Sequence, residues 1–164
     1  MDGINKMYYS GLNVVDTANG PGVRVSLFVS GCELKCPGCF NPEAQNPKFG
    51  KRFTDETFNE LIEALRPKHI KGLSLLGGDP LYPNNRYKIA TIIKRVKQLY
   101  NKDIWLWTGY EIEYLREQAK TDEYLKFILD NVDVIVDGPF IEEKKDLTLQ
   151  YRGSSNQRVI VNTK

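Results

Sequence analysis

The chain has 164 residues, of which 41% are hydrophobic, so it can bury one proper hydrophobic core but hardly two, and we expect one domain over residues 1–164. Lysine and arginine total 23 against 21 aspartate and glutamate, with both signs mixed along the sequence, which argues against a nucleic-acid partner. The N-terminus lacks a signal peptide, and no apolar run approaches the roughly 20 residues that span a bilayer. We therefore expect a cytoplasmic protein that does not associate with membranes.

Strands and helices alternate along most of the chain. Short runs of β-branched, aromatic and other apolar residues predict strands at Val23–Val29, Gly72–Leu76, Asp103–Thr108, Val132–Asp137 and Arg158–Val161. Apolar residues at helical spacing predict helices between an N-cap at Thr54 and Pro67, over Tyr87–Tyr100, and as one or two helices within Glu111–Leu129. The segment Asn41–Arg52 is the longest without periodicity, which predicts a loop.

This alternation favours an α/β fold with a mostly parallel sheet covered by helices, which right-handed crossovers would curl toward a barrel. The chain is too short for a full eight-unit barrel of about 250 residues, so we expect an open, partial β/α barrel. Ligands of such folds bind at the carboxyl ends of the parallel strands. Three segments follow predicted strands and should share that rim: the cysteine-containing loop, GGDP (Gly77–Pro80) and TGY (Thr108–Tyr110).

The chain has three cysteines, Cys32, Cys36 and Cys39, and all of them follow the first of these strands. An odd number of thiols in a protein expected to be cytoplasmic argues against a disulfide framework. Thiolates at this spacing, in a loop punctuated by glycine and proline, can converge on one metal centre. The fourth ligand is open: His69, the only histidine, would complete a structural zinc site, whereas an iron–sulfur cluster would keep one open iron. We favour the cluster because His69 precedes a strand instead of following one.

The spacing Cys32-x3-Cys36-x2-Cys39, with Phe40 after the last cysteine, resembles the signature of radical S-adenosylmethionine (SAM) enzymes. Further segments narrow the resemblance: NGPGVR (Asn19–Arg24), LFVSGC, GGDPLYPNN (Gly77–Asn85), WTGY (Trp107–Tyr110), VDGPF (Val136–Phe140) and RGSSNQR (Arg152–Arg158). Together they resemble the activating proteins of anaerobic ribonucleoside-triphosphate reductases, a family of radical SAM glycyl radical enzyme activases. The usual radical SAM motif ends in glutamate after the glycine pair, and Asp79-Pro80 at this place matches the reductase-activating branch.

The resemblance implies a single radical SAM domain whose 4Fe-4S cluster is held by Cys32, Cys36 and Cys39. The open iron would bind the methionine part of SAM, and reductive cleavage of SAM would give a 5'-deoxyadenosyl radical. That radical would generate a glycyl radical on the large subunit of anaerobic ribonucleotide reductase. A flavodoxin-like protein would supply the electron.

The same resemblance assigns contacts with SAM. Gly77 and above all Gly78 would bring the backbone close to the methionine ammonium, so that a side chain at position 78 should weaken SAM binding. Asp79 would bind the same ammonium or hold the turn. The backbone of Gly38 and Cys39 and the ring of Phe40 would lie against the adenine, and Thr108 is a weaker candidate for the ribose or the carboxylate.

Two other functions stay open at this point. One is a small radical SAM enzyme acting on a small molecule, such as a deazaguanine precursor, which needs a pocket lined by specific polar groups. The other is a zinc-stabilised binding module without catalysis. The residue types of RGSSNQR demand no particular chemistry, and we expect Arg24, Arg152 and Arg158 to be salt-bridged surface groups and Trp105 and Trp107 to pack on the sheet.

Overall fold

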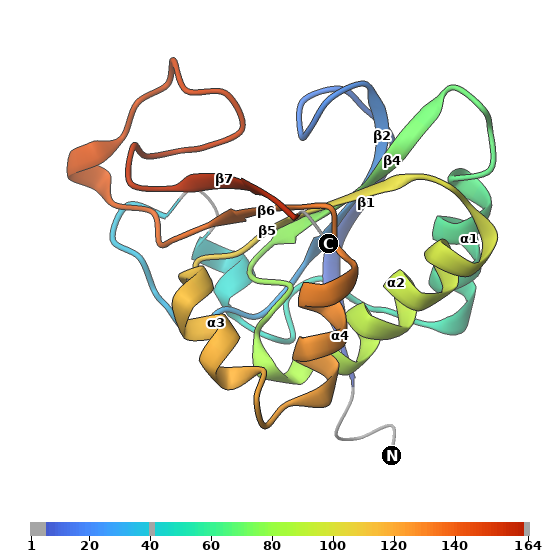
Figure 1. The fold of residues 1–164 in the computed structure, drawn as a ribbon, viewed down its shortest axis with the longest axis horizontal. Helices are drawn as coiled ribbons and strands as arrows, with labels where there is room; N and C mark the ends of the chain where they lie inside the picture. Colours follow the sequence, from blue (N-terminus) through green and yellow to red (C-terminus); the bar gives the residue numbers. More distant parts are fainter. Residues whose placement is uncertain (1–5, 40–41, 163–164) are drawn as a thin grey trace.

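The computed structural model describes residues 6–39 and 42–162, which are built around one sheet of seven strands (Figure 1). Their spatial order is β3-β1-β2-β4-β5-β6-β7. The strands are β1 (Tyr8–Asp16), β2 (Val23–Val29), β3 (Lys51–Arg52), β4 (Ile70–Gly77), β5 (Asp103–Trp107), β6 (Val134–Asp137) and β7 (Arg158–Val161).

The four central strands, β2, β4, β5 and β6, run parallel to one another. At one edge β1 pairs antiparallel with β2 and β3 with β1, and at the other edge β7 pairs antiparallel with β6. The sheet is therefore mixed, and the expectation of a mostly parallel sheet was wrong. It is open, as expected, because the edge strands β3 and β7 do not meet.

The expected strands are all present, and the structure adds β1 and β3. Most residues of β1 are only half-buried or exposed, and its register with β2 shifts twice, which leaves no clean alternation for sequence reading to find. The expected loop before Arg52 contains a 3-10 turn, Pro42–Gln45, and the two-residue strand β3. The strands β1 and β3 are therefore defined by their pairing with neighbouring strands and not by a periodic pattern of their own.

Four helices pack along the same side of the sheet: α1 (Asp55–Ala64), α2 (Arg86–Leu99), α3 (Ile112–Gln118) and α4 (Glu123–Asn131) (Figure 1). Thr54 caps α1 as expected, since its side chain accepts a hydrogen bond from the Thr57 amide at 3.3 Å. The region from Glu111 to Leu129 forms two helices. In the described part of the chain, no helix is long and apolar enough to cross a bilayer.

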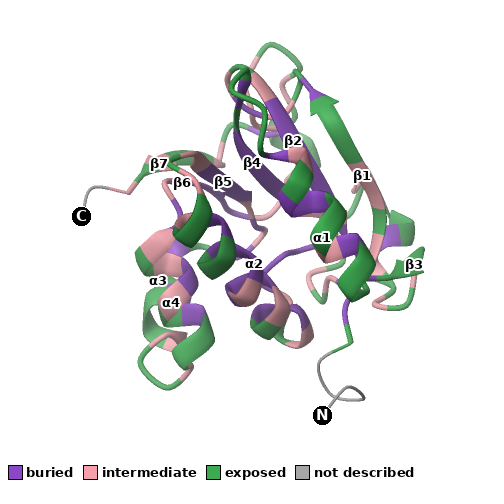
Figure 2. Cartoon of the chain, turned by 90° about the vertical axis from the view of Figure 1, so that its right-hand side faces the viewer, coloured by how far each residue is buried: buried purple, intermediate pink, exposed green. Residues whose placement is uncertain are grey.

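The main hydrophobic core lies between the sheet and these helices, and Figure 2 shows buried residues in the central strands and on the helix sides that face them. The opposite face carries a smaller cluster of Trp105, Val134 and Val136, with Trp107 and Tyr151 packed against it. The Trp105 and Tyr151 rings meet edge to face at 5.0 Å, and the Trp107 indole donates to the Tyr151 carbonyl at 2.8 Å. Both tryptophans thus pack on the sheet, as expected.

Arg24 lies at the amino-terminal end of the parallel strands and is fully buried, so its expected surface position was wrong. Its guanidinium donates to Ser74 Oγ at 2.7 Å and to the Leu73 carbonyl at 3.0 Å, and it pairs with Asp103 at 2.5 Å. A Cβ at Gly72 would lie 2.2 Å from the Asp103 carbonyl oxygen, so only glycine leaves room there. The arginine of NGPGVR therefore joins β2, β4 and β5.

Candidate functional site

The segments that follow β2, β4, β5 and β6 meet at one rim of the sheet, around a cavity of about 230 Å³. All three cysteines line it, and so do four other residues expected at the site: Gly77, Gly78, Asp79 and Thr108. Gly38 is not among the lining residues, and Phe40 lies outside the described residues. The remaining wall comes from Leu34, Leu76, Trp107, Gly109, Val136, Gly138, Phe140, Gly153 and Gln157.

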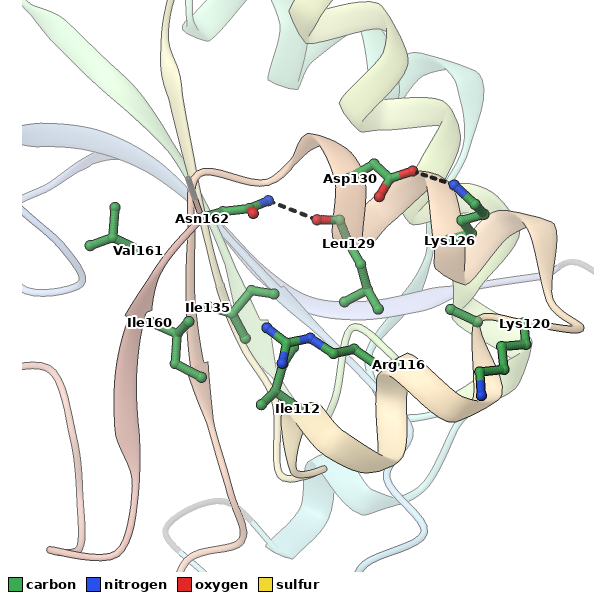
Figure 3. A pocket seen from close by; sticks show the side chains of 11 residues that line it. Ile112, Arg116, Lys120, Lys126, Leu129, Asp130, Ile135, Ile160, Val161 and Asn162 are labelled. Carbon is green, nitrogen blue, oxygen red and sulfur yellow. Dashed lines mark hydrogen bonds and ion pairs between the residues drawn. The ribbon is translucent and has the colours of Figure 1, made fainter. Parts of the chain in front are cut away.

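A larger cavity, of about 430 Å³, lies on the helix side between α3, α4, β6 and β7 (Figure 3). Its floor is apolar, and three cations surround it, of which Lys120 pairs with Glu117 and Lys126 with Asp130, each at 2.8 Å. No thiol and none of the expected site residues lines this cavity. The chemistry therefore points to the smaller cavity at the rim.

The cysteine loop, residues 30–39, is fixed to its surroundings through backbone hydrogen bonds. The Gly31 and Cys32 amides donate to the carbonyls of Ala44 and Gln45, at 2.6 and 3.1 Å. On the other side, the Asp79 amide donates to the Gly31 carbonyl at 2.7 Å. Gly31 has φ 105° and lies against the Tyr82 ring, a conformation and a space that favour glycine.

The three thiols are free and half-buried, and they face the same cavity. Burial raises the pKa of the Cys32 thiol to about 11, and the Asp79 carboxylate and Cys36 add to this rise. Such a thiol stays protonated near neutral pH unless a bound cation favours the thiolate. Among the described residues, no three histidine, cysteine or acidic side chains already stand at metal-binding separation.

As a donor set, three thiols on one loop beside a shared cavity fit an iron–sulfur cluster. The alternative zinc site fails on position. His69 immediately precedes β4, whereas the cysteine loop follows β2, and these two strands are parallel. The imidazole therefore lies at the end of the sheet opposite the thiols and cannot be their fourth ligand.

The two glycines of GGDP pack directly on backbone. Gly77 has φ 115°, and a Cβ there would lie 2.4 Å from the Val29 carbonyl oxygen. A Cβ at Gly78 would lie 2.5 Å from the Ala44 carbonyl oxygen and 2.8 Å from that of Gly31. Glycine is thus required at both positions because the backbone of Val29, Gly31 and Ala44 approaches closely, a reason that the sequence did not reveal.

Asp79 is fully buried, and its carboxylate is surrounded by donors. It accepts hydrogen bonds from the Leu81 and Gly109 amides, both at 2.9 Å, and from the Thr108 hydroxyl at 2.9 and 3.1 Å. Burial nevertheless raises the pKa of Asp79 to about 6 against the opposing effect of these bonds and of Arg86. Asp79 therefore holds the GGDP turn against the WTGY segment, while SAM contacts of Asp79 and Thr108 stay a prediction.

Tyr110, the last residue of WTGY, was not among the expected site residues. Its side chain is buried, and its hydroxyl donates a hydrogen bond to Glu33, which directly follows Cys32. Burial and this hydrogen bond raise the pKa of Tyr110 above its usual value. Next to it, a Cβ at Gly109 would lie 2.3 Å from Leu34 Cδ1, so Leu34 also packs against this segment.

The RGSSNQR segment contributes Gly153 and Gln157 to the wall of the rim cavity, and hydrogen bonds to backbone carbonyls hold the segment in place. The Gln157 side chain donates through Nε2 to the Gly138 carbonyl at 2.9 Å, and the Arg152 guanidinium donates to the Gln157 backbone carbonyl at 3.0 Å. Arg158 pairs with Asp137 at 2.5 Å at the partly exposed edge of the sheet, as expected for a salt-bridged group. Arg152 is half-buried and has no ion pair within the described ranges, so its expected salt bridge is not seen.

Residues 18–160 match a sequence family described as a 4Fe-4S single cluster domain. The chain is 45% identical, over 158 residues and 96% of both chains, to the anaerobic ribonucleoside-triphosphate reductase-activating protein of Enterobacteria phage T4. This chain belongs to the same family. Proteins of that name from Vibrio cholerae serotype O1 and Escherichia coli strain K12 are 43% and 41% identical over 154 and 156 residues. These matches cover 92% and 93% of this chain and 96% and 97% of the two relatives.

The family membership confirms the resemblance that the sequence motifs carried. The matched domain supports an iron–sulfur cluster as the resident cofactor of this reductase-activating family. Since Cys32, Cys36 and Cys39 are the only cysteines in the sequence, no other residues can supply thiolate ligands.

Proposed function

We propose that this protein activates anaerobic (class III) ribonucleotide reductase by generating a glycyl radical on its large subunit, through reductive cleavage of SAM at a 4Fe-4S cluster. The observation that carries the proposal is the meeting of three thiols with the GGDP and WTGY segments around one rim cavity. The names of the relatives and the cluster domain support the same function. In this proposal the open sheet, covered by helices on one face, is the partial barrel of radical SAM enzymes.

Cys32, Cys36 and Cys39 would hold the cluster at the carboxyl end of β2. When bound, the cluster would supply one electron, delivered by a flavodoxin-like donor, for cleavage of the carbon–sulfur bond of SAM. The protein's own part is to bind, orient and exclude water. The half-buried position of the thiols beside Trp107 and Val136 gives the site an apolar wall on the side away from the loop.

SAM would lie between the cysteine loop and the GGDP segment. We assign the methionine ammonium to the backbone at Gly77 and Gly78, and the adenine to Gly38, Cys39 and Phe40. Because the polar atoms of Asp79 and Thr108 already bind each other, these two residues would act by fixing both loops around SAM.

A protein substrate fits this rim better than a small molecule does. The polar side chains of the wall are used within the protein: Asp79 binds Thr108, Trp107 binds the Tyr151 carbonyl, and Gln157 binds the Gly138 carbonyl. Few groups are therefore left for recognising a small substrate. The connection between β6 and β7 contributes Gly138, Phe140, Gly153 and Gln157 to the wall of the cavity.

The test uses anaerobically reconstituted, reduced protein with SAM and an anaerobic ribonucleotide reductase whose candidate glycine carries deuterium at Cα. We expect deuterium in 5'-deoxyadenosine and a glycine-centred electron paramagnetic resonance (EPR) signal on the reductase. Protein with Cys36→Ala is the control and should give neither. Deoxyadenosine without deuterium and without that signal, across several reductases, would contradict the proposed substrate and favour a small molecule.

A further inference from the structure

One side-chain hydrogen bond joins the cysteine loop to the segment after β5. The Tyr110 hydroxyl donates to the Glu33 carboxylate across 77 positions of sequence, and Glu33 is the neighbour of the first cysteine. We propose that this pair, the Glu33–Tyr110 latch, is a positioning device that sets where the three thiols stand relative to the GGDP segment. Neither residue carries out chemistry, and the purpose of the latch rests on the proposed function.

Residues 108–110 hold two loops at the same time. Thr108 and the Gly109 amide bind the carboxylate of Asp79 in the GGDP segment. Two neighbouring residues of the cysteine loop contact the same segment: Glu33 accepts a hydrogen bond from Tyr110, and Leu34 packs on Gly109. The GGDP segment also bonds directly to the base of the cysteine loop, through the Asp79 amide and the Gly31 carbonyl, and residues 108–110 add a second connection that reaches beyond Cys32.

Tyr110 is itself held rigidly, as a positioning residue must be. Only 6% of it is exposed, and its ring stacks on Tyr114 with the centroids 5.5 Å apart and the planes 13° apart. The Arg86 guanidinium lies over the Tyr110 ring, 6.0 Å from its centroid. The same guanidinium donates a hydrogen bond to the Leu81 carbonyl at 2.8 Å. The Tyr110 carbonyl accepts a hydrogen bond from the Gly138 amide at 3.0 Å, so the segment that follows β6 is also attached to Tyr110.

The middle of the cysteine loop needs such an external support. Lys35 has φ 48°, which is uncommon for a residue with a side chain and persists where neighbouring contacts hold it. The base of the loop is tied to the turn at Pro42–Gln45 by the backbone bonds of Gly31 and Cys32. The latch and Leu34 tie the part beyond Cys32 to the other side of the cavity.

The first experiment measures the alkylation of the cysteines by iodoacetamide in reduced, cluster-free protein, peptide by peptide, by mass spectrometry. Tyr110→Phe keeps the stacked ring and removes only the hydroxyl. Because Glu33 is exposed, the lost bond should contribute no more than an ordinary hydrogen bond, and we expect the thiols to react about five- to tenfold faster. Tyr114→Phe is the matched control: its hydroxyl has no hydrogen bond within residues 6–39 and 42–162, and the rate should stay unchanged.

Three further variants separate positioning from general loss of structure. Glu33→Ala should raise the alkylation rate as Tyr110→Phe does, and Glu33→Gln, which keeps a carbonyl acceptor, should restore part of the protection. The double variant Tyr110→Phe with Glu33→Ala should react no faster than either single variant, since both remove the same bond. In reconstituted protein, the change that SAM causes in the EPR spectrum of the reduced cluster should be weakened by Tyr110→Phe and unaffected by Tyr114→Phe.

Equal alkylation rates in wild type and Tyr110→Phe would overturn the latch, and so would additive effects in the double variant. Glu33 is exposed, so Glu33→Ala carries the test if Tyr110→Phe does not fold. A wild-type protein that takes up no iron or cleaves no SAM would refute the proposed function alone. The alkylation result does not depend on the cluster and would still decide the latch.

Discussion

Gly78 offers the sharpest test of how the rim is built. On sequence alone, a side chain at this position should weaken SAM binding and leave the iron content unchanged. The structure changes that expectation, because a Cβ at Gly78 points at the Ala44 and Gly31 carbonyl oxygens, at 2.5 and 2.8 Å, and at the Gly31 amide nitrogen at 2.9 Å. Gly31 directly precedes Cys32, so the substitution should disturb the cysteine loop in addition to the GGDP segment.

The size of the effect follows from these separations. The approach of 2.5 Å is nearly 1 Å closer than an ordinary contact between a carbon and an oxygen atom, and the atoms it meets belong to backbone that cannot rotate away. Overpacking of this kind costs about 1–3 kcal/mol. We therefore expect Gly78→Ala to lower the free energy of unfolding by about 2–3 kcal/mol and to lower iron uptake together with SAM binding.

The measurements are urea unfolding of the cluster-free protein, iron per chain after anaerobic reconstitution, and SAM affinity. Gly11→Ala is the matched control, since a Cβ there meets the Phe28 ring at an ordinary 3.7 Å and should change none of the three. Unchanged stability and iron content in Gly78→Ala, with only SAM affinity lost, would refute the packing argument and restore the simpler expectation.

Three further predictions concern the thiols, the buried carboxylate and the buried arginine. Alanine at any one of the three cysteines should abolish SAM cleavage with dithionite as the electron donor while the far-ultraviolet circular dichroism stays native; near-normal cleavage by any of them would remove that thiol from the ligand set. The folded-state pKa of Asp79 is raised to about 6 from 3.8, so the native state binds the extra proton, and stability is lost as the pH rises from about 4 to 6. Urea titrations should show wild type losing up to about 3 kcal/mol relative to Asp79→Asn over that range, and a constant difference would contradict the assignment. Arg24→Met leaves Asp103 without its closest cation and should destabilise the fold by about 3 kcal/mol; a loss below about 1 kcal/mol would show that the pair contributes little.

The order and type of the central elements could be predicted because each carries its own periodic signal. The run Val23–Val29 is apolar enough to identify a buried strand, and Thr54 with two acids after it identifies a helix start. The rim itself was also predictable, since the carboxyl ends of parallel strands share one edge of a sheet. The three cysteines follow the strand Val23–Val29, which predicted the cysteine loop on that edge, although Phe40 lies outside the described residues.

What the sequence by itself determined was therefore local: the helices, the central strands and the segments that follow them, with the three thiols in one loop. The tertiary structure alone decided the edge strand β1, the antiparallel pairing of β7 with β6, the burial of Arg24 and the bond between Glu33 and Tyr110. Arg24 and Glu33 depend on partners 79 and 77 positions away, Asp103 and Tyr110, and the pairing directions of the edge strands leave no pattern in the local sequence. A polar residue reads as exposed until a distant donor or acceptor compensates its burial, and that partner exists only in the folded chain.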